Sequence, residues 1–300
     1  MKIYAIMMTY EQMDWLPWSI DQFDRALKFG AVDKVLIAEG AHSKAMPERS
    51  NDGSWEYLNG RIGNNKRYEL FDIAPFRNNC NRYDKAQAAT LNHMCSNFPM
   101  DDETWLFYIH DDEFFFDSFL KNIKNICEKA SSENIDMVIT KQLAFSFNMK
   151  LYWQNRTCYM LCRWYEGNYW APATTLCYQN GVPYLKKKNK IKFDSSFENT
   201  TFHFNCVKRI AREKIRYQLS AEKGTPNALK WFNDVWLKAD LNNLEEAYKA
   251  NKKIYGFYGF RSDWPDMSSA KRQVLSVYEG KYPEILEAHP YNNVEDIRWI

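Results

Sequence analysis

The first 39 residues alternate between apolar runs and a helical pattern, and this alternation constrains the fold more than any other feature. Ile3 to Thr9 is a short apolar run typical of a buried parallel strand. Trp15 to Phe29 carries apolar residues at helical spacing and is followed by Gly30, a residue type that commonly ends helices. Val32 to Ala38 is a second apolar run. Strand, helix and strand in so short a stretch predict a right-handed βαβ unit, and therefore an α/β fold.

The same alternation continues to about residue 150. Residues 41 to 66 are rich in Gly, Asn, Ser and charge, which predicts a long loop. Further strands are predicted at Tyr68 to Ile73, Trp105 to Ile109 and Met137 to Ile139, and further helices at Tyr83 to Asn97 and Phe119 to Ala130.

Beyond residue 150 the sequence changes character. Residues 151 to 207 mix aromatic and β-branched residues with Asn, Gly and Pro, which indicates irregular antiparallel strands. The remainder has helical patterns at Lys208 to Lys223, Asn227 to Ala239, Leu244 to Ile254 and Ala270 to Tyr278. There is no internal repeat and no low-complexity linker. We therefore expect two parts, 1–150 and 151–300, within one compact unit that has a mixed sheet flanked by helices and a helical C-terminal section.

Composition excludes several classes of protein. Of the 300 residues 45% are hydrophobic, which is typical of a globular chain and excludes a disordered one. The 40 basic and 38 acidic residues give a net charge of +2, which requires neither a nucleic acid nor a membrane as partner. No apolar stretch reaches the roughly 18 residues of a transmembrane helix. Met1 to Ile6 lacks the pattern of a signal peptide, so we expect a soluble, cytoplasmic protein.

The seven cysteines indicate a reducing compartment, because an odd number in a chain of this size does not suggest a disulfide framework. Cys158 and Cys162 are four residues apart, but no second pair and no nearby histidine completes a zinc site. We expect both to be buried thiols.

Three consecutive acids follow the clearest strand pattern in the chain. Asp111, Asp112 and Glu113 come directly after Trp105 to Ile109 and His110. Open α/β sheets bind their ligands at the carboxyl ends of their strands. Adjacent carboxylates repel each other there, and a divalent cation relieves that repulsion and attracts phosphates. A solvated acidic turn is the alternative interpretation.

The segment from Trp105 to Phe114 resembles the region of GT-A glycosyltransferases, especially family 2-like members, where a strand ends in Asp-x-Asp-Glu-Phe. The resemblance implies a GT-A, Rossmann-like fold and a metal-dependent hexosyl- or similar transferase. It also implies that Asp112 binds Mn²⁺ or Mg²⁺, which bridges the diphosphate of a nucleoside diphosphate sugar. His110 occupies the first acidic position of this DXD-like motif, which is a departure from the family pattern.

The resemblance extends to other residues of the expected donor site. It implies donor contacts from Thr9 and Tyr10 at the end of the first strand, from Glu39 at the end of the second, and from Arg82, His110, Asp111 and Lys208. His203, in the segment Thr201-Phe202-His203-Phe204, corresponds to a family histidine that can complete the metal shell or approach the diphosphate. A UDP-sugar is the favoured donor.

An inverting transferase also needs a carboxylate that takes the proton of the acceptor hydroxyl. Glu166, Asp194 and Glu198 are the candidates because they follow the acidic motif in the expected acceptor region. The sequence does not rank them, and a retaining enzyme needs no such base.

Two other functions remain open. A nucleotidyltransferase would use a similar sheet, but the segment Met7 to Glu11 has no glycine of a phosphate loop. A non-catalytic nucleotide-sugar or carbohydrate-binding protein is the second alternative, and His110 in place of an acid favours it. The acceptor stays open among glycan, lipid and protein. A modified base in DNA is a minor option that rests on the basic run Lys186 to Lys190.

Overall fold

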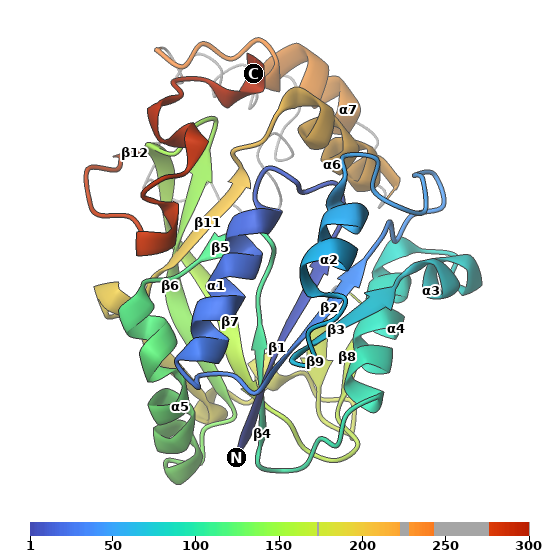
Figure 1. Cartoon of the computed structure of the whole chain (residues 1–300), viewed down its shortest axis with the longest axis vertical. Helices are drawn as coiled ribbons and strands as arrows, with labels where there is room; N and C mark the ends of the chain where they lie inside the picture. Colours follow the sequence, from blue (N-terminus) through green and yellow to red (C-terminus); the bar gives the residue numbers. More distant parts are fainter. Residues whose placement is uncertain (173, 223–227, 243–275, 300) are drawn as a thin grey trace. The chain divides into compact units, whose positions relative to one another are not determined.

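The computed structural model describes residues 1–172, 174–222, 228–242 and 276–299 (Figure 1). The chain forms two compact units, and each is assembled from separate segments. The first unit contains Met1–Gln142, Thr157–Phe202 and Tyr282–Glu287; the second contains Leu143–Arg156, His203–Lys281 and Ala288–Ile300. This division is more interleaved than the predicted boundary at residue 150, because the chain leaves the first unit and returns to it twice.

The first unit is built on four parallel strands, which confirms the predicted βαβ opening. These strands and the first helix are β1 (Lys2–Thr9), α1 (Leu16–Lys28), β2 (Lys34–Glu39), β3 (Tyr68–Asp72) and β4 (Thr104–Tyr108). β1 pairs in parallel with both β2 and β4, with Thr9 opposite Glu39 and Ile6 opposite Tyr108. The carboxyl ends of these strands therefore lie along one edge of the sheet, called the carboxyl edge below.

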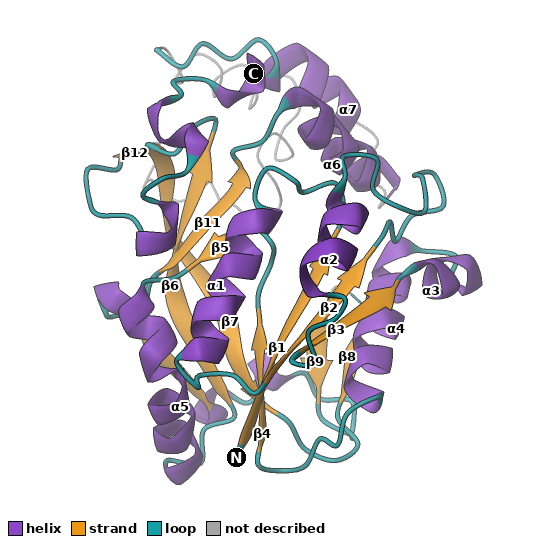
Figure 2. Cartoon of the chain, in the orientation of Figure 1, coloured by secondary structure: helices purple, strands orange, loops and turns teal. Residues whose placement is uncertain are grey.

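Further strands extend this parallel core, and β7 runs antiparallel to β4, so the sheet is mixed (Figure 2). Residues 151–207 were predicted as antiparallel strands, but β10 in that range pairs in parallel with β6. The additional strands are β5 (Glu113–Phe114), β6 (Met137–Ser146), β7 (Leu151–Arg163), β10 (Ile191–Asp194), β11 (Thr201–Cys206) and β12 (Ser276–Val277). The strand order is β3-β2-β1-β4-β7-β6-β11-β5, with β10 paired to β6 and β12 to β7. β8 (Tyr169–Ala171) and β9 (Thr175–Cys177) form a separate antiparallel pair. The predicted α/β class with a mixed, helix-flanked sheet is confirmed.

Alternating side chains of β1 divide the core of the first unit into two layers. Ile3, Ala5 and Met7 pack in one cluster with α1, α2 (Ser54–Ile62) and α5 (Asp117–Ser132). Tyr4 and Ile6 point to the other face and pack in a second cluster with α4 (Tyr83–Ser96). Helices thus cover both faces, as a buried parallel sheet requires.

The predicted loop over residues 41–66 is wrong in its second half. Helix α2 forms there, preceded by Gly53 at a positive φ of 91°. Leu58 and Ile62 lie four residues apart on one face and are buried in the core. Two apolar residues with helical spacing are enough to hold this helix, although the surrounding composition is that of a loop. A short helix, α3 (Ala74–Asn79), follows β3.

The second unit contains the helices of the C-terminal section. They are α6 (Ile210–Glu222), α7 (Ala228–Trp231) and a π-helical turn (Phe232–Trp236), which confirms the first helical pattern and most of the second. Arg298 is buried and donates hydrogen bonds to the carbonyls of Trp236 (2.6 Å) and Ala239 (2.8 Å). The predicted helix Leu244 to Ile254 and residues 270–275 lie outside the described residues. Ser276 and Val277, predicted as helix, pair with β7 as a strand instead.

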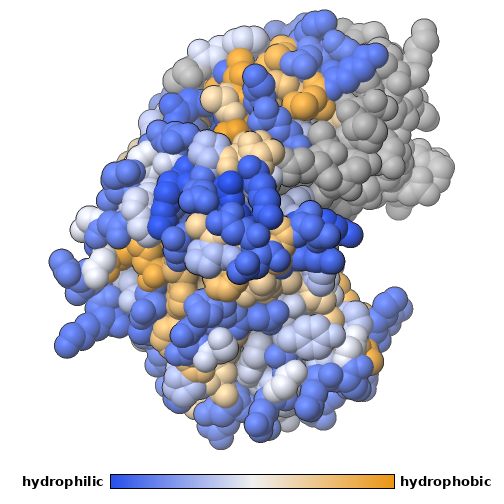
Figure 3. Space-filling model, turned by 90° about the vertical axis from the view of Figure 1, so that its right-hand side faces the viewer, coloured by the Kyte–Doolittle hydropathy of each residue, from blue (hydrophilic) through white to orange (hydrophobic). Residues whose placement is uncertain are grey.

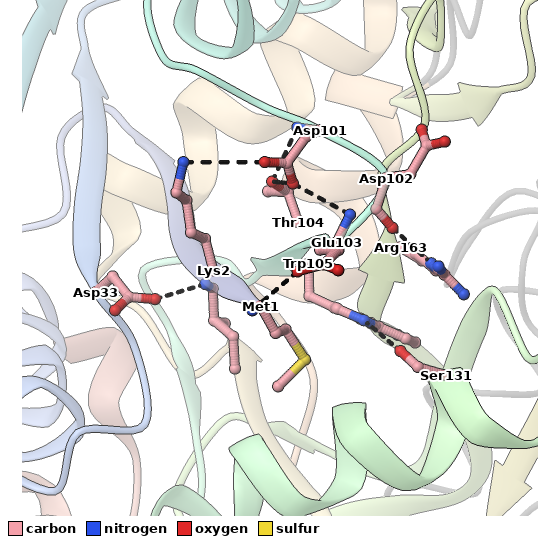
Figure 4. Close-up of polar contacts among 11 residues, drawn as sticks. Met1, Lys2, Asp33, Asp101, Asp102, Glu103, Thr104, Trp105, Ser131 and Arg163 are labelled. Carbon is pink, nitrogen blue, oxygen red and sulfur yellow. Dashed lines mark hydrogen bonds and ion pairs between the residues drawn. The ribbon is translucent and has the colours of Figure 1, made fainter.

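Polar contacts fix the amino ends of β1 and β4, opposite the carboxyl edge (Figure 4). The Asp33 carboxylate accepts from the backbone N–H of Ile3 at 2.7 Å. The indole of Trp105 donates to the Ser131 hydroxyl at 3.1 Å, and Arg163 donates to the carbonyl of Asp102 at 2.8 Å. These bonds attach the strand starts to neighbouring segments of the first unit.

No helix among the described residues is long and apolar enough to cross a membrane. Hydrophilic residues predominate on the face shown in Figure 3, where apolar residues form small groups. Cys158 and Cys162 are free and buried, as expected.

We predict that Phe107→Ala lowers the free energy of unfolding by about 3–5 kcal/mol. Phe107 is fully buried at the centre of β4 and packs against the rings of Phe115 and Phe119. Val277→Ala, at a position that is 61% exposed, serves as the control and should change stability by less than about 0.5 kcal/mol. Chemical denaturation measures both, and equal effects would contradict the described core.

A candidate metal and donor site at the carboxyl edge

The acidic motif forms a tight turn between β4 and β5. The backbone N–H of Glu113 donates to the carbonyl of His110 at 3.2 Å, which closes the turn. Asp111, Asp112 and Glu113 are only 5%, 2% and 2% exposed. This excludes the solvated acidic turn that was the alternative for this motif. Carboxylates buried in this way need compensating charge or hydrogen bonds.

Two polar residues of α1 donate hydrogen bonds to the backbone of this turn. The hydroxyl of Ser19 donates to the carbonyl of Asp111, and the amide of Gln22 donates to the carbonyl of Glu113 at 3.1 Å. The same Gln22 side chain accepts from the backbone N–H of Phe115 at 2.8 Å. Both polar side chains are fully buried. Neither was predicted as a site residue, although a Ser and a Gln three residues apart on the apolar face of a helix are a usable signal.

Both oxygens of the Glu113 carboxylate accept hydrogen bonds from within the protein. One of its oxygens accepts from the backbone N–H of His110 at 2.8 Å. The other accepts from the amide of Gln142 at 3.0 Å and from the thiol of Cys158 at 3.6 Å. The Glu113 carboxylate is therefore committed to the protein itself.

The carboxylates change the charge state of their neighbours. Burial by itself would lower the pKa of His110, but Glu113, 3.5 Å from the ring nitrogen Nδ1, together with Asp112 and Asp111, raises it to about 9. Burial and Glu113 raise the pKa of the Cys158 thiol, so that it stays protonated. His110 thus brings a positive charge to the position where the family pattern has an acid.

Glu39 is fully buried at the end of β2, beside Thr9 on β1. Its carboxylate accepts from the backbone N–H of Ser50 at 3.0 Å and from the Ser50 hydroxyl. Arg49 lies 3.6 Å from the second carboxylate oxygen. Burial raises the pKa of Glu39, although Ser50 and Arg49 oppose that shift. Glu39 therefore holds the 41–53 loop against the sheet. A contact between Glu39 and a nucleoside stays a prediction.

Two arginines of the first unit have different surroundings. Arg77 is buried on α3 and donates to the carbonyls of Met46 (2.8 Å) and Lys44 (3.4 Å), which fixes the 41–53 loop from the other side. Arg82, the predicted donor residue, has a side chain that is 65% exposed and forks onto Asp84 at 3.0 and 2.6 Å. The structure thus places Arg82 in an exposed ion pair at the start of α4. Tyr10, like Thr9, is buried at the end of β1.

The three candidate bases lie in different places. Glu166 follows β7, which runs antiparallel to β4, and its backbone N–H donates to Asp102 at 3.2 Å. It therefore lies beside the start of β4, while Asp112 follows its end, and the five residues of β4 span about 16 Å. Asp194 ends β10 opposite Thr140 of the parallel strand β6, and Glu198 is exposed in the 3₁₀ turn that follows.

His203 and Lys208 belong to the second unit. Both are buried, His203 on β11 and Lys208 shortly after that strand ends. β11 begins in the first unit, where the hydroxyl of Thr201 is 3.0 Å from that of Thr140.

No protein-family model and no curated protein matches this sequence. Among solved structures, residues 1–349 of S. aureus TarS are similar at 11% identity over 89% of this chain and 76% of that one, with a TM-score of 0.42. The same segment in complex with UDP-GlcNAc has 10% identity over 84% and 80% of the two chains, with a TM-score of 0.34. Mannose-1-phosphate geranyltransferase from Thermus thermophilus has 11% identity over 83% and 68%, with a TM-score of 0.30. These scores are below 0.5, so the fold is assigned from the chain's own strand order.

We predict that Gln22→Leu destabilises the protein by about 2–6 kcal/mol. Leucine keeps the volume but leaves one backbone N–H and one backbone C=O of the turn buried without their partner, at roughly 1–3 kcal/mol each. Gln87→Leu, on the partly exposed side of α4, is the control and should be nearly neutral. If denaturation curves showed the two variants to be equally stable, Gln22 would not be holding the turn.

Proposed function

We propose that this chain is a metal-dependent glycosyltransferase of the GT-A type. It would transfer a hexosyl or similar sugar from a nucleoside diphosphate sugar, with UDP favoured, to an acceptor hydroxyl. The observation that carries the proposal is the burial of Asp111 and Asp112 at the carboxyl edge, directly after β4. That edge is where α/β sheets of this kind bind nucleotides.

The residues of the proposed metal site fit a divalent cation. Asp112 offers a carboxylate oxygen, and we assign a neutral ring nitrogen of His203, from the second unit, as the other protein ligand. A donor set of carboxylate and imidazole suits Mn²⁺ better than Mg²⁺, which prefers oxygen. When bound, the cation would supply Lewis-acid stabilisation of the negative charge on the leaving diphosphate. Since His203 belongs to the second unit, its ligation is tested separately from that of Asp112.

The chain's own residues would preorganise the turn that receives the donor. Glu113 and Gln22 hold its backbone by hydrogen bonds, so the Asp111 and Asp112 carboxylates need little rearrangement on binding. We assign Asp111, His110, Thr9 and Tyr10 to the donor. A protonated His110 would favour a diphosphate, whereas an imidazole that binds a cation must be neutral.

Asp194 is the best placed of the three candidate bases. Asp194 ends β10, where it lies opposite Thr140 of the parallel strand β6. Two residues further along β6, Gln142 contacts Glu113. Burial raises the pKa of Asp194, but hydrogen bonds from Ser196 and Asn199 lower it overall, so the carboxylate is ionised and able to accept a proton. Glu166 lies beside the opposite end of β4, which argues against it.

One observation favours a second function. His110 replaces the first acid of the motif, as in a protein that keeps the donor site without catalysis. Such a nucleotide-sugar-binding protein would bind the donor but would neither transfer nor hydrolyse the sugar. Product analysis with UDP-GlcNAc, the ligand in the TarS complex, separates the two functions.

We predict that Asp112→Asn abolishes the Mn²⁺-dependent thermal stabilisation by a UDP-sugar. A ligand at 100 times its dissociation constant adds about 2.7 kcal/mol, so wild-type protein should melt several degrees higher only when both Mn²⁺ and donor are present. Glu69→Gln removes an acid of the same charge from the exposed surface and should keep the full shift. His203→Ala, run in parallel, reports whether the second unit supplies a ligand. An undiminished shift in Asp112→Asn would contradict the site.

For Asp194 we expect a loss of turnover without a loss of donor binding. Asp194→Asn should lower kcat by about 10²- to 10⁴-fold, the usual contribution of a general base. The UDP-sugar thermal shift should match that of wild type. Glu166→Gln is the matched control and should keep its kcat. The reverse ranking of the two variants would move the base to Glu166.

A further inference from the structure

A lysine-rich segment of the first unit has no role in the proposed reaction. Residues 183–193 contain five lysines and no acid, which gives a local charge of +5. The whole chain carries only +2, so the remainder carries −3. Positive charge is thus concentrated in these 11 residues.

An anchored pair of 3₁₀ turns presents these lysines. The turns are Tyr184–Lys186 and Lys188–Lys190, and they lead directly into β10. Tyr184 is buried, stacks on Tyr178 at 4.0 Å and donates to the carbonyl of Arg163 at 2.6 Å. The segment is therefore fixed to the core by a side chain at its start and by strand pairing at its end.

Three of the five lysines form no ion pair with a described residue. Lys192 pairs with Glu133 at 2.6 Å, and Lys187 lies over the Tyr178 ring at 4.0 Å. Lys186, Lys188 and Lys190 form no ion pair with any residue in the part of the chain that the structure describes. Lys186 and Lys188 are exposed, and Lys190 is partly exposed.

Two apolar side chains of the same 11-residue segment are exposed as well. Leu185, in the first 3₁₀ turn, is 38% exposed, and Phe193, on β10, is 55% exposed. Among the described strands β10 pairs only with β6, so Phe193 lies on an edge strand. Leu185, Lys186, Lys188, Lys190 and Phe193 are called the lysine surface below.

We propose that the lysine surface docks the protein on an anionic lipid membrane. Lysines contribute roughly 1 kcal/mol each near an anionic bilayer, that is, about fivefold in partitioning. Exposed Leu and Phe side chains enter the boundary between headgroups and acyl chains, where they gain apolar burial. A soluble polyanion would use the charges but would leave Leu185 and Phe193 without an apolar partner. Proteins that bind nucleic acids also favour bidentate Arg contacts and aromatic rings that stack on bases. Residues 183–193 contain no Arg.

Vesicle co-sedimentation of the full chain tests this proposal. Wild-type protein should bind vesicles that contain phosphatidylglycerol, should bind vesicles of phosphatidylcholine alone much more weakly, and should lose binding as salt increases. The double variant Lys186→Gln/Lys188→Gln should reduce partitioning on the order of twenty-fold. The control Lys66→Gln/Lys124→Gln makes the same change in net charge at two exposed lysines elsewhere and should reduce it far less.

The apolar residues separate a membrane from a soluble polyanion. Leu185→Ser/Phe193→Ser should weaken vesicle binding while leaving retention on a polyphosphate or duplex DNA column unchanged. Two results would overturn the proposal. Polyanion binding that needs the lysines without vesicle binding would make the partner a soluble polymer. Equal vesicle binding by wild type and both lysine variants would mean that the lysines only keep an edge strand from aggregating.

Discussion

The carboxyl edge of the first unit depends on the hydrogen bonds that the Glu113 carboxylate accepts. This carboxylate is buried, and it accepts hydrogen bonds from the His110 backbone, from Gln142 and from Cys158. These bonds tie the end of β4 to β6 and β7, while Gln22 ties the same turn to α1. The hydrogen bonds of Glu113 thereby hold its neighbours Asp111 and Asp112 in a fixed position. The same carboxylate raises the pKa of His110 against the effect of burial.

Strands β1, β2 and β4 could be predicted from sequence because they are buried on both faces and read as continuous apolar runs, whereas the edge strand β3 is only partly buried. The predictions for β1, α1, β2 and β4 agree with the structure to within a few residues. Helix α2 was missed because two buried apolar residues in a polar stretch give little periodicity. β12 was read as helix because its pairing with β7 depends on residues more than 100 positions away.

The site was predictable in part, for the same reason. The acidic motif could be placed at the carboxyl edge because it comes after the apolar pattern of a predicted strand. The roles of Glu39 and Arg77 did not follow, because both depend on how the 41–53 loop folds back onto the sheet. Glu166 lies beside the far end of β4 because β7 runs antiparallel to β4, and the sequence pattern does not indicate which strand β7 pairs with. The buried partners Ser19 and Gln22 show that polar residues on the apolar face of a predicted helix are an informative signal.

Calorimetric titration of UDP into the wild-type protein, with and without Mn²⁺, tests the central claim most directly. If Asp112 lies at the centre of a metal-assisted diphosphate site, UDP should bind at least tenfold more tightly with Mn²⁺ than without it, a difference of about 1.4 kcal/mol. UDP binding that is unaffected by Mn²⁺, Mg²⁺ or a chelator would contradict the metal site. No binding of any nucleoside diphosphate would contradict the donor site itself.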